Sequence, residues 1–296
     1  MVPRERMALM ARGLIATDRL MLGFLAAFTA IILWRAGDAP SWPLLLAAAA
    51  LILCLIALLA RAPANSAVVQ FVGGAYPVML TPVVYTLLGV FNVEAARFYD
   101  VRVQHWESAL FRSELSVTWH ARMPSLALSW VMHLGYWSYY VIVAGALLGL
   151  WFLASREAFA RGGFIVTLAF YVCYLIFILF PVMGPRHFFG DATGPIAEIL
   201  PARLMRSAQH GGSAMGTAFP SSHVAAGWCA VYALWRDLRW LALVLAPAAL
   251  ALALGTVYGQ FHYGVDAAGG ILLALVLAAA ADPLRRVLAR ERSPSP

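Results

Sequence analysis

Long apolar runs separated by short polar segments set the pattern of this chain. A helix needs about 20 residues to cross a hydrocarbon core of roughly 30 Å, and most of the runs approach or exceed that length. The strict alternation of apolar and polar residues that marks a membrane β-barrel is absent. The pattern therefore predicts an all-α polytopic membrane bundle with about eight transmembrane helices. The expected spans are residues 20–34, 42–60, 67–91, 125–153, 163–183, 220–235, 240–258 and 264–281.

Three stretches depart from simple spans. The third run contains Gly73, Gly74, Pro77 and Pro82, which predicts a kinked helix. Residues 92–124 mix acids and arginines with aromatic residues, which favours amphipathic helices lying at the membrane interface, with a small soluble lid as the alternative. The long loop 186–219 is expected to hold a short amphipathic helix at 195–205. Aromatic residues gather early in the fourth span, as in an interfacial belt: Trp130, Tyr136, Trp137, Tyr139 and Tyr140.

Composition supports the membrane assignment. Of the 296 residues, 62% are hydrophobic and only 12% are charged, whereas soluble domains carry about 25% charged residues. The net charge of +7 comes from arginines in the short loops, so membrane topology explains it better than nucleic-acid binding does. Cys54, Cys173 and Cys229 stand alone in apolar segments and suggest neither a metal site nor a redox motif.

The arginines also predict orientation. Eight spans place both termini on one side, and that side collects most of the unbalanced arginines, including those of a basic leader in residues 1–19. The positive-inside rule then makes the termini cytoplasmic, in a multi-pass protein of the cell (inner) membrane. The leader is interpreted as preceding an uncleaved first span rather than as a signal peptide. The expected regions are 1–66 with N-terminal membrane helices, 67–124 with the kinked span and interfacial segment, 125–284 as catalytic core, and 285–296 as basic cytoplasmic tail.

Three polar junctions share the extracytoplasmic face in this topology, and each carries residues suited to phosphate chemistry. Arg186 ends the fifth span, and its guanidinium fork matches phosphate oxygens. Ser221, Ser222 and His223 open the sixth span, where free N–H groups and a positive dipole end also favour an anion. The turn after the seventh span holds His262 and, four residues on, Asp266, which can lie on one helical face and orient the imidazole.

Two histidines allow a division of labour in phosphoryl transfer. One attacks phosphorus and the other protonates the leaving oxygen, which implies a phosphohistidine intermediate. A metal site is the weaker interpretation, because acids near these junctions are few and no histidine or carboxylate spacing forms a ligand set. No cofactor is expected.

At these residues the chain resembles the type 2 phosphatidic acid phosphatase superfamily of membrane lipid phosphatases, lipid phosphotransferases and haloperoxidases. Pro220-Ser221-Ser222-His223 matches the family's second motif, and His262 to Asp266 matches the end of its third. The resemblance implies a six-helix phosphatase-type core, with His262 as nucleophile, Asp266 as its orienting partner and His223 as general acid. It further implies that Arg186, Ser221 and Ser222 bind the phosphate.

The chain also departs from the family pattern. The lysine of the first motif falls on Leu179, and the serine and arginine of the third fall on Gly255 and Thr256. Gln260 is a candidate donor in place of Thr256, and His187 is a further candidate for phosphate binding. The missing charges and the stretch 100–111 look more like the branch of inositol phosphorylceramide synthases, which would imply sphingolipid metabolism.

The expected function is a metal-independent lipid phosphatase that acts on a lipid phosphate or phospholipid at the extracytoplasmic face. The first alternative is a lipid head-group phosphotransferase, in which an alcohol acceptor replaces water. The alternative from another class is a membrane transporter, which would need polar groups near the middle of the bilayer on broken helices. No nucleic-acid partner is expected.

Overall fold

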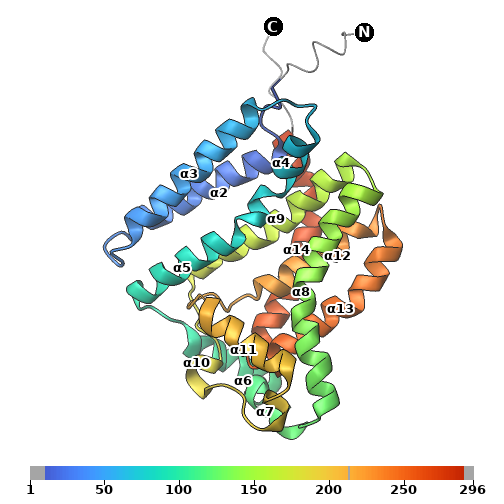
Figure 1. The fold of residues 1–296 in the computed structure, drawn as a ribbon. Coiled ribbons are helices and arrows are strands. Elements are labelled where there is room, and N and C mark those ends of the chain that lie inside the picture. Colours follow the sequence, from blue (N-terminus) through green and yellow to red (C-terminus); the bar gives the residue numbers. More distant parts are fainter. Residues whose placement is uncertain (1–10, 213, 290–296) are drawn as a thin grey trace.

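The computed structural model describes residues 11–212 and 214–289, and this part of the chain is built of helices without a β-strand. The prediction of an all-α polytopic bundle is confirmed. With the numbering of Figure 1, the helices are α2 (Ala16–Trp34), α3 (Trp42–Arg61), α4 (Ala67–Met79), α5 (Thr81–Ala95), α6 (Asp100–Phe111), α7 (Leu115–Arg122), α8 (Leu126–Leu153), α9 (Arg156–Leu179), α10 (Arg186–Phe189), the 3-10 turn η1 (Pro195–Ala197), α11 (Leu200–Gly212), α12 (Ser222–Trp235), α13 (Arg239–Tyr258) and α14 (Gly264–Ala289).

Seven helical segments among the described residues are long and apolar enough to cross a membrane. One of them is the kinked third span, which consists of α4 and α5 and breaks at Leu80. The eighth expected span is α12, which has only 14 residues and is therefore about 21 Å long. It packs against α8, α9, α13 and α14, so this short helix is surrounded by the other long helices of the region 125–284.

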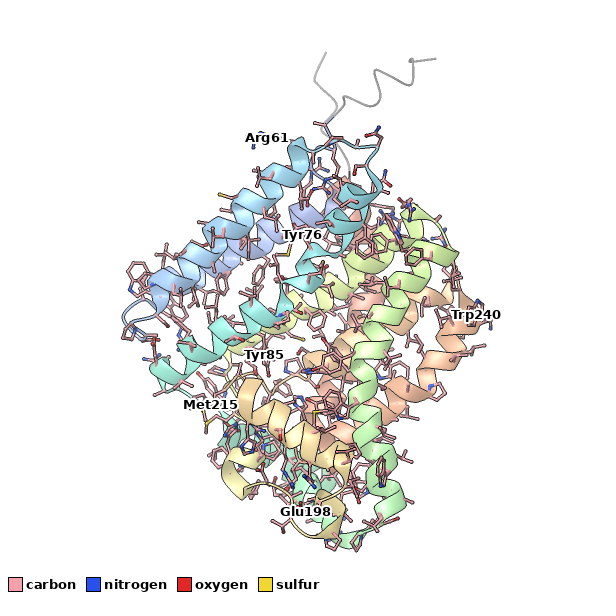
Figure 2. The ribbon with its side chains drawn as sticks, in the orientation of Figure 1. Arg61, Tyr76, Tyr85, Glu198, Met215 and Trp240 are labelled. Atoms are coloured by element: carbon pink, nitrogen blue, oxygen red, sulfur yellow. The ribbon has the colours of Figure 1, made fainter. Side chains whose placement is uncertain are left out.

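The bundle has two distinct ends. Near one end the guanidinium of Arg19 donates to the carbonyl oxygen of Leu288, which brings the start of α2 beside the end of α14. The helices α12 and α14 both begin at the other end, where the 186–219 loop lies. Arg61 marks the first end and Glu198 the second in Figure 2. The three polar junctions predicted from topology all lie at the second end.

Small residues let α8 and α13 approach closely, as is common between membrane helices. A Cβ added to Gly255 would stand 2.1 Å from the carbonyl oxygen of Met132, and one added to Gly135 would stand 2.5 Å from that of Ala251. Both obstacles are backbone atoms, so neither can rotate away. These two glycines therefore fix the distance between α13, which ends at the His262 turn, and α8, which faces His223.

We expect Gly255→Ala to destabilise the protein by about 1–3 kcal/mol, because the added methyl forces the two backbones apart. The measurement is thermal unfolding in detergent. Gly145→Ala is the matched control on α8, since a Cβ there meets nothing within 4 Å. Equal melting temperatures for the two variants would contradict the close approach.

The segment expected to lie at the interface forms the two helices α6 and α7. These helices do not rest on a membrane surface alone, because α6 packs on α14 and α7 on α13. One face of α6 is covered by protein and buries Asp100, Val103 and Glu107. The site end therefore depends on residues before position 125, where the catalytic core was expected to begin.

The expected aromatic belt of the fourth span needs correction. Tyr136 is buried with 4% of its surface exposed, and Tyr136, Tyr139 and Tyr140 line an internal cavity rather than only the rim of the bundle. Of the set, Trp130 is 42% exposed and Tyr140 is 57% exposed, and the other three are less exposed. The loop helix expected at 195–205 is present in two parts, as η1 and α11.

Candidate active site

Three loops at one end of the bundle are tied together through their backbones. The N–H of Ala218 donates to the carbonyl of Val182 at 2.9 Å, which joins the loop before Arg186 to the loop before α12. The N–H of Ser221 donates to the carbonyl of Asp266 at 3.0 Å, which joins the start of α12 to the first turn of α14. All three predicted junctions are thus held next to one another.

His262 lies in the tight turn between α13 and α14. Its Nδ1 is 3.3 Å from Oδ2 of Asp266, and its Nε2 is 3.2 Å from the hydroxyl of Ser221. The same Asp266 oxygen accepts the N–H of Tyr263 at 2.8 Å. A carboxylate can only accept here, so Nδ1 carries the proton and the lone pair is left on Nε2. Nε2 is then the nitrogen available for attack, with Ser221 as its present hydrogen-bond donor.

The environment of His262 keeps the imidazole uncharged. Only 6% of its surface is exposed, and this burial lowers the pKa of His262 to about 4, against the opposing effect of a backbone hydrogen bond to Ala218. A neutral imidazole at pH 7 retains the lone pair that a nucleophile needs.

His223 stands in the first turn of α12. Ser221 is the N-cap of this helix and accepts the N–H of Val224 at 3.5 Å. The rings of His223 and His262 have centroids 6.4 Å apart. Around His223, the ring of Tyr139 lies 4.4 Å away edge-on and the ring of Tyr136 lies 5.7 Å away.

The two histidines line one small cavity. Arg186, His223 and His262 line it together with Tyr85 and Tyr136. Among the described residues that line it, Arg186 alone carries a permanent charge. One cation, two imidazoles and two phenol groups therefore line this cavity.

The remaining predicted site residues lie at different distances from this cavity. Ser222 is buried and lines a second cavity beside His223. His187 is exposed on α10 and lines neither cavity. Gln260 is buried in the His262 turn at φ 59°, and it too lines neither. Binding of phosphate by His187 or Gln260 stays a prediction.

The positions where the family pattern has other residues supply no replacement charge. Leu179 is 48% exposed at the end of α9. Thr256 is fully buried, and its hydroxyl donates to the carbonyl of Ala253 in its own helix at 2.8 Å. Gly255 cannot be a serine in this packing, because a Cβ there would stand 2.1 Å from the Met132 carbonyl oxygen. The close contact between α8 and α13 thus explains one departure from the motif.

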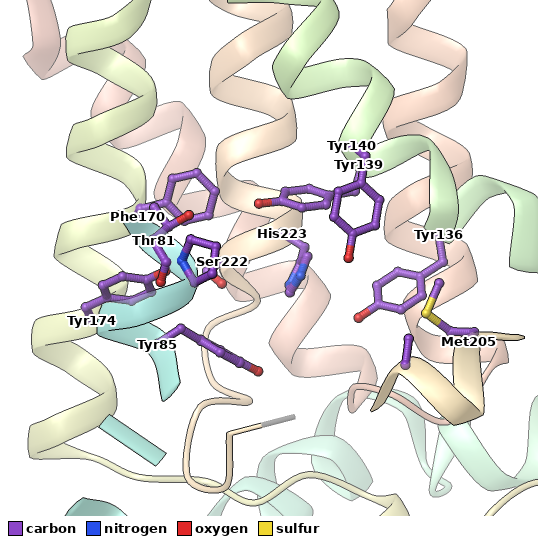
Figure 3. Close-up of a pocket in the computed structure, with 12 residues that line it drawn as sticks. Thr81, Tyr85, Tyr136, Tyr139, Tyr140, Phe170, Tyr174, Met205, Ser222 and His223 are labelled. Carbon is purple, nitrogen blue, oxygen red and sulfur yellow. The ribbon is translucent and has the colours of Figure 1, made fainter. Parts of the chain in front are cut away.

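The second cavity, of ≈ 220 Å³, adjoins the first and shares His223, Tyr85 and Tyr136 with it (Figure 3). Six aromatic rings from α5, α8 and α9 line it: Tyr85, Tyr136, Tyr139, Tyr140, Phe170 and Tyr174. Among the described residues that line it there is no arginine or carboxylate. Exposed Pro82 on α5 and Tyr140 on α8, which is 57% exposed, mark its outer edge. The sequence analysis did not predict this aromatic cavity. The tyrosines of α8 have the pattern of an interfacial aromatic belt, and Tyr85 belongs to no motif that would mark it as a site residue.

Within the described residues, no three side chains of histidine, cysteine, aspartate or glutamate come together in a way that could hold a metal ion. Asp266 is turned toward His262 and the Tyr263 backbone. The roles of nucleophile, orienting carboxylate and general acid that were predicted for His262, Asp266 and His223 stay predictions.

Comparison with known proteins identifies the family. A family model described as the PAP2 superfamily matches residues 101–280, which is more than half of the chain and extends from α6 into α14. No curated protein and no solved structure matches the chain.

Proposed function

The chain belongs to the PAP2 (type 2 phosphatidic acid phosphatase) superfamily, and we propose that it is a membrane lipid phosphatase that cleaves a phosphate ester of a lipid through a phosphohistidine. The observation that carries this proposal is the geometry of His262. It is buried, oriented by Asp266 through Nδ1, and faces His223 across a cavity that also contains Arg186.

The proposed reaction has two steps. Nε2 of His262 attacks phosphorus, the N–P bond forms, and the P–O bond to the lipid alcohol breaks while His223 gives a proton to the leaving oxygen. Asp266 stabilises the positive charge that the imidazole gains. In the second step His223 takes a proton from water, the water oxygen attacks phosphorus, and the N–P bond breaks. Arg186 and the N-terminus of α12 stabilise the phosphoryl oxygens throughout.

The aromatic cavity supports a lipid as the substrate. His223 lines both the aromatic cavity and the cavity that it shares with His262, so a leaving group that His223 protonates can extend into the aromatic cavity. Aromatic faces suit the apolar part of the alcohol, and hydroxyl groups suit its polar atoms. The exposed residues at its edge are on α5 and α8, so we infer that the lipid enters sideways from the membrane between these helices.

A second candidate function is head-group transfer to an alcohol acceptor, as in the inositol phosphorylceramide synthase-like branch. The observation that favours it is the single permanent charge among the described residues lining the cavity between the histidines. One arginine matches the single negative charge of a phosphodiester better than the two charges of a phosphate monoester. In this alternative a phospholipid provides the phosphorus, and an alcohol takes the place of water.

We also propose that the site faces away from the cytoplasm, in the cell (inner) membrane. The support is the charge at the opposite end of the bundle. The described arginines near that end are Arg12, Arg19, Arg61, Arg156, Arg161, Arg236, Arg239, Arg285 and Arg286. By the positive-inside rule such an end is cytoplasmic. Residues 1–10 and 290–296, with the rest of the predicted leader and tail, lie outside the described residues.

The test of function uses purified wild type and His262→Ala in detergent with lipid phosphates and phospholipids, each with and without candidate alcohols. Free phosphate and new lipids are followed together. Free phosphate from the wild type that is indifferent to alcohol supports the phosphatase. A new phospholipid that forms only with an acceptor supports the transferase. If neither free phosphate nor a new lipid forms from any substrate, the result would favour the transporter alternative.

We expect activity to survive chelation, because protein side chains fill every role in the proposed mechanism. The measurement is turnover after incubation with EDTA and removal of the chelator complex. Vanadate, which mimics pentavalent phosphorus, should inhibit. Loss of activity with EDTA that returns with a divalent ion would contradict the histidine-only mechanism.

A further inference from the structure

Two buried carboxylates on α6 take no part in the mechanism above. Asp100 is 1% exposed and Glu107 is fully buried. Burial of a carboxylate is costly unless hydrogen bonds or a cation compensate it, and no ion pair to either one occurs among the described residues. Backbone N–H groups compensate them instead, and most of those groups belong to the segments that carry Arg186 and His262.

Asp100 holds the loop that leads to Arg186. Its Oδ2 accepts the N–H of Met183 and its Oδ1 accepts the N–H of Gly184, both at 2.9 Å. Gly184 has φ 99°, a left-handed conformation that favours glycine. The turn that brings Arg186 to the cavity is therefore fixed at two successive amides by one side chain.

Glu107 holds the turn that carries the nucleophile. Its Oε1 accepts the N–H of Gly264 at 3.0 Å, and its Oε2 accepts the N–H of Val265 at 2.8 Å. These are the first N–H groups of α14, where a negative charge is also favoured by the helix dipole. Oε1 also accepts the N–H of Leu115 at 3.2 Å. A Cβ at Gly264 would stand 2.7 Å from the Phe111 ring and 3.0 Å from Oε1 of Glu107, so the glycine leaves room for both.

A third residue on the same face completes the arrangement. Gln104 donates to the hydroxyl of Tyr263 at 3.0 Å, and that hydroxyl lies 3.4 Å from Oδ1 of Asp100. Positions 100, 104 and 107 follow the helical spacing of one face. Tyr263 is the neighbour of His262, so α6 contacts the Arg186 loop and the His262 turn through one continuous set of hydrogen bonds.

We propose that Asp100 and Glu107 are positioning residues that set the separation between the phosphate-binding Arg186 and the nucleophile His262. The two residues act on different loops, so their loss has different consequences. Asp100 governs where Arg186 meets the phosphate, and Glu107 governs how His262 and Asp266 are aimed at phosphorus. Misplacement of reacting groups by about 1 Å costs up to about 100-fold in rate. The kinetic part of this proposal rests on the proposed function, whereas the loop contacts do not.

The test compares Asp100→Asn and Glu107→Gln, which keep the shape of each side chain but turn one accepting oxygen into a donor. We expect Asp100→Asn to raise KM and the vanadate inhibition constant about 10-fold with a smaller change in kcat. We expect Glu107→Gln to lower kcat about 10- to 100-fold with little change in KM. Glu198→Gln is the matched control, because Glu198 is an exposed carboxylate that pairs with Arg206.

Hydrogen exchange measured by mass spectrometry gives a readout that needs no substrate. Exchange should rise in residues 182–186 for Asp100→Asn and in residues 262–267 for Glu107→Gln, and in neither segment for Glu198→Gln. If a variant fails to fold, Tyr263→Phe replaces it in the test. This change removes only the hydroxyl shared by Gln104 and Asp100, and it should raise exchange in the same segments by a smaller amount. Unchanged local exchange, or kcat and KM per folded molecule equal to wild type, would overturn the positioning role. If the wild type turns over none of the substrates, yet the variants show the expected rise in exchange, the proposed function is rejected and the loop contacts stand.

Discussion

Alanine at position 262 is expected to abolish turnover, with kcat lowered on the order of 10⁴-fold or more. His262 supplies the atom that bonds to phosphorus, and no neighbouring group can replace a covalent nucleophile. The measurement is release of product from a lipid that is radiolabelled in its phosphate. The protein is also examined for an acid-labile phosphate label after rapid denaturation. Wild type should carry the label and His262→Ala should not.

Asp266→Asn is the comparison that separates the nucleophile from its partner. The amide can still contact Nδ1 at the present 3.3 Å, but it stabilises the positive imidazole less and permits the other tautomer. Activity should fall by less than in His262→Ala, and the label should still form. If the His262→Ala variant were fully active, or still carried the label, the covalent nucleophile would have to be another residue.

The rate should also depend on pH in a way set by burial. Because burial lowers the pKa of His262 to about 4, the imidazole keeps its lone pair at pH 5 and above and loses it only as the pH falls through 4. The kcat/KM profile should therefore fall by about tenfold per pH unit below that value. A limb near the ordinary histidine pKa of about 6.5 that persists in His223→Ala would contradict a buried, neutral nucleophile.

The second large effect concerns His223. We expect His223→Ala to lower kcat by about 10²- to 10⁴-fold with a lipid alcohol as leaving group, because an alkoxide cannot depart easily without a proton. With p-nitrophenyl phosphate the loss should be much smaller, because nitrophenolate leaves unprotonated. The measurement is the ratio of rates on the two substrates for wild type and variant.

Tyr139→Phe is the control for this second result. It removes the hydroxyl of Tyr139 and keeps the aromatic ring, whose centroid lies 4.4 Å from that of His223. Its effect should be modest and should not depend on the leaving group. Equal losses on both substrates in His223→Ala would assign His223 to phosphate binding rather than to proton transfer.

The sequence alone was sufficient for the class of fold and for the centre of the candidate site. Apolar runs of about 20 residues have few solutions other than membrane helices, and seven such segments are present among the described residues. The pairing of His262 with Asp266 follows from a spacing of four residues at the start of a helix. The convergence of Arg186, His223 and His262 followed from counting spans, since alternate helix ends must share one face.

Tertiary structure decided which polar and aromatic residues are buried and against what. The charges of 92–124 predict an amphipathic surface, yet Glu107 is fully buried and bonded to N–H groups 157 and 158 positions away. Tyrosines of α8 look like an interfacial belt, yet they join Tyr85 and Tyr174 from other helices around one cavity. The physical reason is common to both: periodicity reports which face of a helix a residue is on, whereas only the packing of distant segments determines whether that face meets lipid, water or backbone amides.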